Sequence, residues 1–588
     1  MCDVRSLRAL SLGVLLLGCC LSVSPWQTEG NPAPQNKSDT IRGRVLNSLT
    51  HAPVARALVY SYDERFAILT DSTGHFEFKV SAGRTERGNE GTVGLTATPE
   101  GAAVSDSTAE DSAGVRIRPI FLSVRKPGFL SEEDVASTPV SPGQNDVTIY
   151  LVPGAYIVGR VTVAGFDFPQ RFRVEIYRRQ IQGGRAFWQS AGWFNTFSDG
   201  GFSFPELYPG TYKLLTHELI DRDPLTYDPR GQLYGYSPRY FPAANSFETG
   251  STIQLSEGTT FNAELSPERR EYYPVEISLA NPPEGQPVRV TVSREGQEDP
   301  GYSLRYNART QKIVGTLPDG AYTVEASTPE RPGQTGIAVI NVRGGPLSGY
   351  ALTLLPNPSV RLSATEEFTS AESTNGIQWD SPGGRASHFG VSLEPADDFG
   401  GRRPSAFGRA SLSRSGEAES QPQLIEDVSP GRYWVNAFTG YGYVASIKCG
   451  ETDLLRNPLV VSAAGLHDPV ELTLRDDGAQ IEGTVENIRR TSGSSPVRGA
   501  QFSAHIYLIP APDSAGQYRE FWVSPEGTFS EAQIPPGTYK VLTFDRPQPD
   551  LDYRDDAAMR KYEPWEQEIQ LLPGQSAHLQ LRLISRGD

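Results

Sequence analysis

A short turn-and-strand phrase occurs four times in this chain and sets the size of its folding units. It reads YPGTYKLLT at Tyr208–Thr216, PDGAYTVEA at Pro318–Ala326, SPGRYWVNA at Ser429–Ala437 and PPGTYKVLT at Pro535–Thr543. Its tyrosines are 110, 111 and 106 residues apart: Tyr212, Tyr322, Tyr433 and Tyr539. Because one β-sandwich domain has about this length, the repeat predicts tandem modules of a single design.

Each copy combines a tight turn with an alternating strand. A Pro-Gly or Asp-Gly pair suits a β-turn, and the residues after it alternate between two faces, as in a half-buried strand. A tyrosine that opens such a strand resembles the tyrosine corner of immunoglobulin-like sandwiches, in which the ring packs inside and the hydroxyl bonds back to the chain. We therefore predict a structural role for the four tyrosines.

Composition agrees with an all-β protein and excludes some partners. The chain has 588 residues, enough for several domains, and its 58 glycines and 46 prolines are typical of many short strands and turns. The net charge is −16, and no basic patch stands out. The sequence therefore argues against nucleic acid as a partner and against electrostatic docking on an anionic membrane.

The N-terminus has the pattern of a targeting signal over residues 1–24, followed by a polar linker over 25–39. Arg5 and Arg8 precede a short apolar run, Ala9–Gly18. The cleavage site of this signal has two interpretations. Leu16-Leu17-Gly18-Cys19 resembles a bacterial lipobox, which would make Cys19 the lipidated first residue, although Leu17 is not the usual small residue. The alternative is ordinary cleavage near Ser24. Either way we expect an exported protein, in the cell envelope (outer membrane or periplasm) or secreted, whose only membrane contact is this anchor.

The first module carries the motifs that point to a family. IRGRVLN (Ile41–Asn47) is followed by PVARALVYSY (Pro53–Tyr62) and TDSTGHFEFKV (Thr70–Val80). This order resembles the carboxypeptidase regulatory-like domain, which implies a transthyretin-like (prealbumin-like) fold of about seven antiparallel strands in two sheets. Module one departs from the family where Ser81–Arg116 replaces the usual P-G-x-Y turn. We expect that polar insertion to be disordered.

The predicted fold class is all-β: after the signal peptide, a tandem array of about five seven-stranded transthyretin-like or Ig-like antiparallel β-sandwiches. The resemblance extends to exported multi-module proteins of soil bacteria that consist of such domains. Modules two to five close with a strand, a turn and a strand, expected to form a hairpin, and Ala557–Lys561 favours a short helix. The predicted domains span residues 40–152, 153–268, 269–357, 358–476 and 477–588.

The family name suggests a peptidase, but the chemistry is missing from the sequence. The chain has seven histidines with no H-E-x-x-H or H-x-x-E spacing for zinc, and it has no G-x-S-x-G, P-loop or G-x-G-x-x-G motif. We therefore predict no enzyme activity, no catalytic residue, no metal site and no cofactor.

Two features could support binding. The aromatic residues of module two are candidates for a platform that stacks sugar rings, unless they cover the core and anchor a loop: Trp188, Trp193, Tyr234, Tyr236 and Tyr240. Two acidic groups could hold calcium, unless they are solvated loops: Asp221, Asp223 and Asp228, and Asp550, Asp552, Asp555 and Asp556. The predicted function is a structural, adhesive or protein-interaction role among cell-envelope proteins. The alternative is a carbohydrate-binding accessory protein that captures extracellular polysaccharide.

Overall fold

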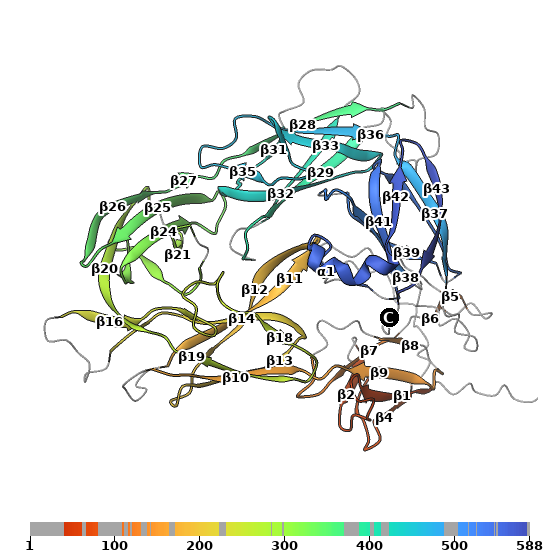
Figure 1. The fold of residues 1–588 in the computed structure, drawn as a ribbon, viewed down its shortest axis with the longest axis horizontal. Coiled ribbons are helices and arrows are strands. Elements are labelled where there is room, and N and C mark those ends of the chain that lie inside the picture. The colour runs from red at the N-terminus through yellow and green to blue at the C-terminus, as the bar shows by residue number, and fades with distance from the viewer. Residues whose placement is uncertain are drawn as a thin grey trace, which may run out of the picture.

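The fold was analysed in a computed structural model of the whole chain. It describes residues 40–584 except 62–65, 80–108, 111–115, 118–119, 131–137, 141–142, 164–170, 223–230, 284, 297–298, 370–386, 400–404, 413–422, 487–503, 515–516, 525, 546 and 549–550. The targeting signal, Cys19, the linker and most of the Ser81–Arg116 insertion lie outside these residues. Figure 1 shows five consecutive β-sandwiches along a curved path, which confirms the all-β tandem array.

Sandwiches one and two each pack a three-stranded sheet on a larger one. The strands of sandwich one are β1 (Thr40–Asn47), β2 (Leu58–Ser61), β3 (Ala67–Leu69), β4 (His75–Lys79), β7 (Ile120–Arg125), β8 (Thr138–Val140) and β9 (Val147–Leu151); β5 (Ala109–Glu110) pairs with β6 (Arg116–Ile117). The strands of sandwich two are β10 (Ala155–Val161), β11 (Arg173–Gln182), β12 (Arg185–Asn195), β13 (Gly201–Leu207), β14 (Gly210–Thr216), β17 (Arg239–Tyr240), β18 (Ile253–Leu255) and β19 (Thr260–Leu265).

Sandwich three borrows two strands from the chain segment that precedes it. Its strands are β15 (Leu219–Ile220), β16 (Leu233–Tyr236), β20 (Arg269–Ala280), β21 (Arg289–Arg294), β22 (Leu304–Asn307), β23 (Lys312–Leu317), β24 (Gly320–Ser327), β25 (Gln334–Val342), β26 (Leu347–Thr353) and β27 (Leu355–Pro356). β16 pairs with the first half of β20, and β23 pairs with its second half. A boundary at residue 268 therefore separates strands that share one sheet.

Sandwiches four and five complete the array. Sandwich four contains β28 (Val360–Glu367), β29 (Ser387–Pro395), β30 (Ala406–Leu412), β31 (Gln423–Ile425), β32 (Gly431–Thr439), β33 (Tyr443–Cys449), β34 (Thr452–Asp453), β35 (Leu459–Val461) and β36 (Val470–Arg475). Sandwich five contains β37 (Ala479–Glu486), β38 (Ala504–Pro510), β39 (Arg519–Val523), β40 (Thr528–Ile534), β41 (Gly537–Phe544), β42 (Gln567–Leu571) and β43 (Ser576–Arg582). The predicted helix is confirmed as α1 (Asp556–Met559), which continues into a 3-10 turn, η2 (Arg560–Trp565).

One topology recurs in all five units. In four sandwiches the first strand lies parallel to the last: β1 with β9, β10 with β19, β28 with β36, and β37 with β43. In sandwich three the same pairing joins β20, the first strand after the two borrowed ones, to β26. Each sandwich encloses its own apolar core between the two sheets. The sequence analysis expected antiparallel sheets and did not anticipate this parallel pair.

The predicted closing hairpins are wrong. In sandwich two, β18 pairs with β14 in one sheet, whereas β19 pairs with β10 in the other. In sandwich five, β42 pairs with β41 and β43 with β37. The chain therefore crosses between sheets at this turn. Alternating apolar residues identify strands and their inward faces, but they are the same whether the next strand joins the same sheet or the opposite one.

The four repeated tyrosines lie in the cores with closely similar geometry. Each is almost fully buried, and each hydroxyl donates to the carbonyl oxygen four residues earlier. The hydroxyl-to-carbonyl distances are 2.8 Å for Tyr212, 3.0 Å for Tyr322, and 2.6 Å for both Tyr433 and Tyr539. The turn glycine makes room for the ring: a Cβ on Gly320 would lie 3.2 Å from the Tyr322 ring. Each copy of the phrase thus supplies the hydrogen-bond acceptor for its own buried tyrosine hydroxyl. This bond also holds the turn against the start of the core strand.

A glycine–phenylalanine pair explains a second repeated motif. Gly43 lies opposite Phe76, and a Cβ there would approach the Phe76 ring to 2.5 Å and the Val147 carbonyl oxygen to 2.3 Å. The same pairing occurs between Gly159 and Phe202 and between Gly483 and Phe529. The ring covers the glycine and the parallel strand passes close beside it. This is why a glycine in the first strand accompanies a phenylalanine in the fourth.

Candidate functional site

The long β11–β12 hairpin of sandwich two docks on sandwich four, which is far away in sequence. The Trp188 amide donates to the Asp398 carbonyl oxygen at 2.7 Å, and Trp188 forms a parallel bridge with Phe399. Phe399 inserts into a small apolar cluster on the outer face of sandwich two, where its ring centroid lies 4.6 Å from that of Phe247 and 5.6 Å from that of Tyr177. Sandwiches two and four therefore share an apolar contact of their own.

The tip of the same hairpin docks on sandwich five. The Tyr553 hydroxyl donates to the Gly183 carbonyl oxygen at 2.7 Å, and Arg554 Nε donates to it at 3.1 Å. Arg179 forms an ion pair with the buried Asp552 at 2.5 Å. Figure 1 shows the orange hairpin reaching the blue α1 region near the centre of the molecule. We call this meeting of sandwiches two, four and five the three-sandwich junction.

Local sequence explains both halves of the contact. Gly183 and Gly184 have φ values of 55° and 70° between paired Gln182 and Arg185, as a two-residue hairpin turn requires. On the other side, residues 551–565 fold back on sandwich five through a second apolar cluster that includes Leu551, Tyr553 and Met559. Asp555 caps α1 by accepting from the Ala557 and Ala558 amides. The hairpin tip of sandwich two thus contacts a loop that is already packed against the apolar cluster of sandwich five.

The junction encloses a cleft of about 990 Å³. Its floor is the outer face of β32 together with neighbouring residues of sandwich four, and its walls are the hairpin tip and the Tyr553 loop. Gln182 and Arg185 of the hairpin tip, Glu394, Trp434 and Asn436 of sandwich four, and Tyr553 of sandwich five line it. Its volume and its mixture of rings and polar groups are within the range of small-molecule and oligosaccharide sites.

Three guanidinium groups, those of Arg185, Arg432 and Arg554, line the cleft together with the carboxyl groups of five acidic residues. Arg185 lies over the Trp434 ring, and its Nη1 is buried without a hydrogen-bond partner. Burial lowers the pKa of Arg185 to about 10, and burial together with the charge of Arg185 lowers the pKa of Arg554 to about 9. Arg554 also pairs with Asp513. The carboxylates of Asp552 and Asp555 already have partners in Arg179 and α1, and the charge of Glu394 favours the charged form of Arg185, whose Nη1 is left buried without a hydrogen-bond acceptor.

The five aromatic residues predicted as a sugar platform do not form one. Tyr236 and Tyr240 are buried, and the Tyr240 hydroxyl donates to the Pro300 carbonyl oxygen. Trp188 contacts Phe247 in the cluster between sandwiches two and four. The Arg269 guanidinium covers the Tyr234 ring, and Trp193, although 57% exposed, carries Arg173 over its ring. The rings mostly cover cores and joints, as the alternative interpretation expected.

The acidic groups considered for calcium also have other partners. Asp221 accepts from Arg269 Nε at 3.0 Å, while Asp223, Asp228 and Asp550 lie outside the described residues. Within the part of the chain that the structure describes, no group of three or more His, Cys, Asp or Glu side chains could hold a metal ion.

A buried carboxyl group lies at the joint of sandwiches two and three. Glu218 Oε1 accepts from the Ser303 amide at 2.8 Å and from its hydroxyl at 2.7 Å, whereas Oε2 is buried without a partner. Burial raises the pKa of Glu218 to about 7. Its charge also raises the pKa of the neighbouring Tyr272, which is itself strongly raised by burial. No motif in the sequence marks Glu218 as a functional residue.

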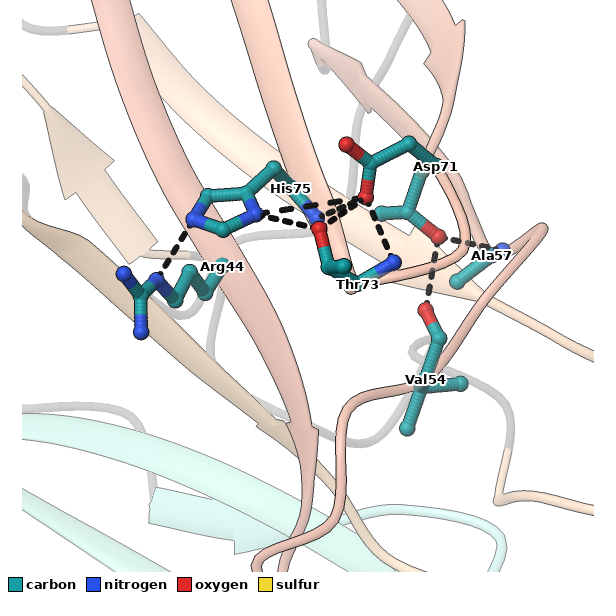
Figure 2. Close-up of polar contacts among 7 residues, drawn as sticks. Arg44, Val54, Ala57, Asp71, Thr73 and His75 are labelled. Carbon is teal, nitrogen blue, oxygen red and sulfur yellow. Dashed lines mark hydrogen bonds and ion pairs between the residues drawn. The ribbon is translucent and has the colours of Figure 1, made fainter.

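The turn before β4 carries the polar network shown in Figure 2. Asp71 Oδ1 accepts from the amides of Thr73 and His75 and from the Thr73 hydroxyl. Arg44 Nε donates to His75 Nε2 at 2.6 Å, so the ring proton lies on Nδ1 and is donated to Thr73 Oγ1, 2.7 Å away. The Thr73 hydroxyl donates to Asp71 and accepts from His75. The network therefore closes a turn and does not activate the Thr73 hydroxyl.

Comparisons with known proteins give a limited result. No family model matches the chain, and no curated protein matches it. Among solved structures, it is similar to the Bacillus anthracis TIE protein at 9% identity, over 73% of this chain and 74% of that one, with a TM-score of 0.14. Two B repeat units of the Staphylococcus aureus collagen-binding protein match at 11% identity over 67% and 94%, with a TM-score of 0.13. The RrgB pilus protein of Streptococcus pneumoniae matches at 9% identity over 73% and 98%, also at 0.13. TM-scores this low carry no information about the function of this chain.

Proposed function

We propose that this chain is an exported, non-enzymatic surface scaffold with a structural or adhesive role. The observation that carries the proposal is the three-sandwich junction. Tandem domains that touch only their sequence neighbours move relative to one another by default. Here sandwich two also contacts sandwiches four and five through an apolar cluster, an ion pair, a backbone hydrogen bond and side-chain hydrogen bonds to a backbone carbonyl. Such cross-contacts favour a frame that holds its outer surfaces at fixed mutual positions.

Further contacts between neighbouring sandwiches support the same interpretation. Ser48 of sandwich one donates to Glu257 of sandwich two at 3.1 Å. Gly333 of sandwich three donates to Asp427 of sandwich four at 2.8 Å, and Tyr443 of sandwich four donates to Asp477 at 2.9 Å. Side chains thus reinforce successive joints as well as the junction. A scaffold that presents surfaces to partners needs this kind of order.

The finer features of the proposal rest on sequence. We assign the sandwiches to the carboxypeptidase regulatory-like type because of the glycine–phenylalanine pairs and tyrosine corners, with domain boundaries near residues 152, 268, 357 and 476. Export and the lipid anchor at Cys19 rest on the N-terminal signal, and the partners would be envelope proteins or polysaccharide. Within the described residues, no helix is both long and apolar enough to cross a bilayer.

The proposal is tested in cells that produce the chain. A membrane-impermeant amine label should react with it on intact cells, and deletion of its gene should lower attachment to surfaces, with rescue by the wild-type chain. Cys19→Ala should abolish palmitate incorporation, and persistent incorporation would refute the anchor. A chain that is inaccessible in intact cells but labelled after lysis, or a purified chain that turns over a peptide or glycan substrate, would contradict the proposed function.

A second candidate function is polysaccharide capture, which the composition of the cleft favours. The cleft combines ring faces with planar polar groups, as sites for sugar chains do. Under this second proposal the sugar-binding site would be the cleft at the three-sandwich junction, in place of the module-two residues predicted from sequence.

A further inference from the structure

We propose that the three-sandwich cleft, together with the exposed Phe407–Phe438 ring pair beside it, binds a segment of a polysaccharide as a run of pyranose rings. This inference rests on the second candidate function, polysaccharide capture, and specifies its site. The proposal is based on the geometry of the floor and on the polar groups that line the cleft.

Phe438 on the floor and Phe407 beside the cleft are both about half exposed. Phe438 is 52% exposed and Phe407 is 49% exposed. Their ring centroids lie 5.9 Å apart and their planes differ by only 13°. Gly390 pairs with Phe438, and a Cβ at Gly390 would lie 2.2 Å from the Phe438 ring, so this ring lies flat on the glycine backbone. Two nearly parallel rings on a sheet face provide a surface on which sugar rings can stack.

The ring surface continues into the cleft along β32. Tyr433 and Val435 of this strand point into the core, so Arg432, Trp434, Asn436 and Phe438 project from the outer face. Successive members of this row are separated by about 6.6–6.8 Å along the strand. Planar polar groups therefore alternate with rings along a single line. A chain of sugars that stacks on Phe438 would meet Asn436 next, and then Arg185 above Trp434.

The cleft offers both donors and acceptors to sugar hydroxyls. Arg185 Nη1 is the buried donor without a partner, and Asn436, Gln182 and Glu394 also line the space. Sugar hydroxyls donate and accept at once, so they suit a site in which guanidinium, amide and carboxylate groups stand close together. The same Arg185 donor could serve a ring hydroxyl or the carboxylate of a uronic acid.

The floor is less suited to a peptide. Peptides that add to a sheet need an open edge whose backbone groups are unpaired. Here β29 has hydrogen-bonded strands on both sides, whereas β32 pairs with β35 only at Gly431–Tyr433 and from there to Thr439 with β29 alone. Over β29, where the ring of Phe438 lies, recognition therefore uses side chains and ring faces. Because the walls belong to sandwiches two and five, a bound glycan would also stabilise the docked hairpin.

The test is calorimetric titration of the full mature chain with cellohexaose, mannohexaose, xylohexaose and hexagalacturonate. We expect saturable binding of at least one probe. Phe438→Ala should weaken it at least about tenfold, the loss expected for one stacked ring. Phe407→Ala should also weaken it. Trp193→Ala is the matched control: it removes an equally exposed ring outside the cleft and should leave affinity unchanged. The exposed rings lie outside the cores, and an unchanged unfolding midpoint verifies that each variant folds.

Each outcome decides the inference. Preferential binding of hexagalacturonate that weakens with salt identifies a uronate as the ligand, and preferential binding of an uncharged hexasaccharide identifies a neutral glycan; both support the proposal. No binding of any probe up to about 1 mM overturns it, as does binding that survives Phe438→Ala or is lost equally in Trp193→Ala. Binding of hexaglutamate with the same Phe438 dependence would overturn it in favour of a peptide. Failure here leaves the scaffold function intact, because surface labelling and attachment test that function separately.

Discussion

The contact between the hairpin tip and sandwich five can be tested by a glycine-to-alanine substitution, which adds one methyl group at the tip. Gly183 and Gly184 both have positive φ, 55° and 70°, so alanine at either position strains the turn. Their surroundings differ sharply. A Cβ on Gly184 would lie 2.2 Å from the Tyr553 ring, whereas nothing lies within 4 Å of a Cβ on Gly183. Gly183→Ala is therefore a matched control for Gly184→Ala.

The expected effect follows from what the collision displaces. Strain in the left-handed region costs roughly 1–2 kcal/mol for both variants and cancels in their comparison. If the Gly184 methyl separates the hairpin from Tyr553, the hydrogen bond to the Gly183 carbonyl is lost, at about 1 kcal/mol. The charged contact between Arg179 and buried Asp552 is lost with it, at about 1.5–3 kcal/mol. Docking should therefore weaken by about 2.5–4 kcal/mol in Gly184→Ala alone.

Hydrogen exchange and small-angle scattering measure this loss. In Gly184→Ala, amides of residues 182–185 and 551–555 should exchange faster and the radius of gyration should increase. Both quantities should stay near wild type in Gly183→Ala. The five cores lie away from this contact, so their unfolding midpoints should change little. Equal behaviour of the two variants would refute the claim that the tip is held by its fit against Tyr553.

Three further predictions concern the cores and one joint. Tyr539→Phe should lower the unfolding free energy of sandwich five by about 1 kcal/mol, and Tyr539→Ala by about 3–5 kcal/mol, in urea titrations; an alanine effect below about 1 kcal/mol would mean that the ring is not buried. Gly159→Ala places a Cβ 2.1 Å from the Ala263 carbonyl oxygen and should cost at least about 1–3 kcal/mol, whereas Gly345→Ala, with nothing within 4 Å, should be near neutral. Glu218 keeps a proton in the folded state up to pH about 7 that the unfolded chain releases near 4.5, so thermal stability should fall as pH rises through this window, and Glu218→Gln should flatten the fall.

Local chemistry was predictable from sequence, whereas pairing between distant segments was not. The corner tyrosines follow from four copies of one phrase, because the turn, the ring and the carbonyl that accepts its hydroxyl lie within five residues. The short helix followed from its alanines in the same way. The closing turn was misread as a hairpin because β18 and β19 have the same alternation in either arrangement.

The candidate site shows the same limit. The alternation around Tyr433 places Trp434 and Phe438 on the outer face of their strand, and the Gly183-Gly184 pair is a recognisable turn signal. Nothing in the sequence says that this turn lies beside Tyr553. Predicted binding rings lie instead at contacts between sandwiches: Trp188, for example, belongs to the apolar cluster on which Phe399 of sandwich four packs. Aromatic density alone does not distinguish a binding surface from an interface between domains.

The parallel pairing of first and last strands has a mechanical consequence. In β10 and β19, as in the other four pairs, the chain enters at one end of the pair and leaves at the opposite end. If the N-terminus is tethered and the far end is pulled, tension runs along both strands in opposite directions. The hydrogen bonds between them then bear the force together, in shear, and cannot be unzipped one at a time. Each sandwich would therefore resist stretching along the chain more strongly than peeling from its side.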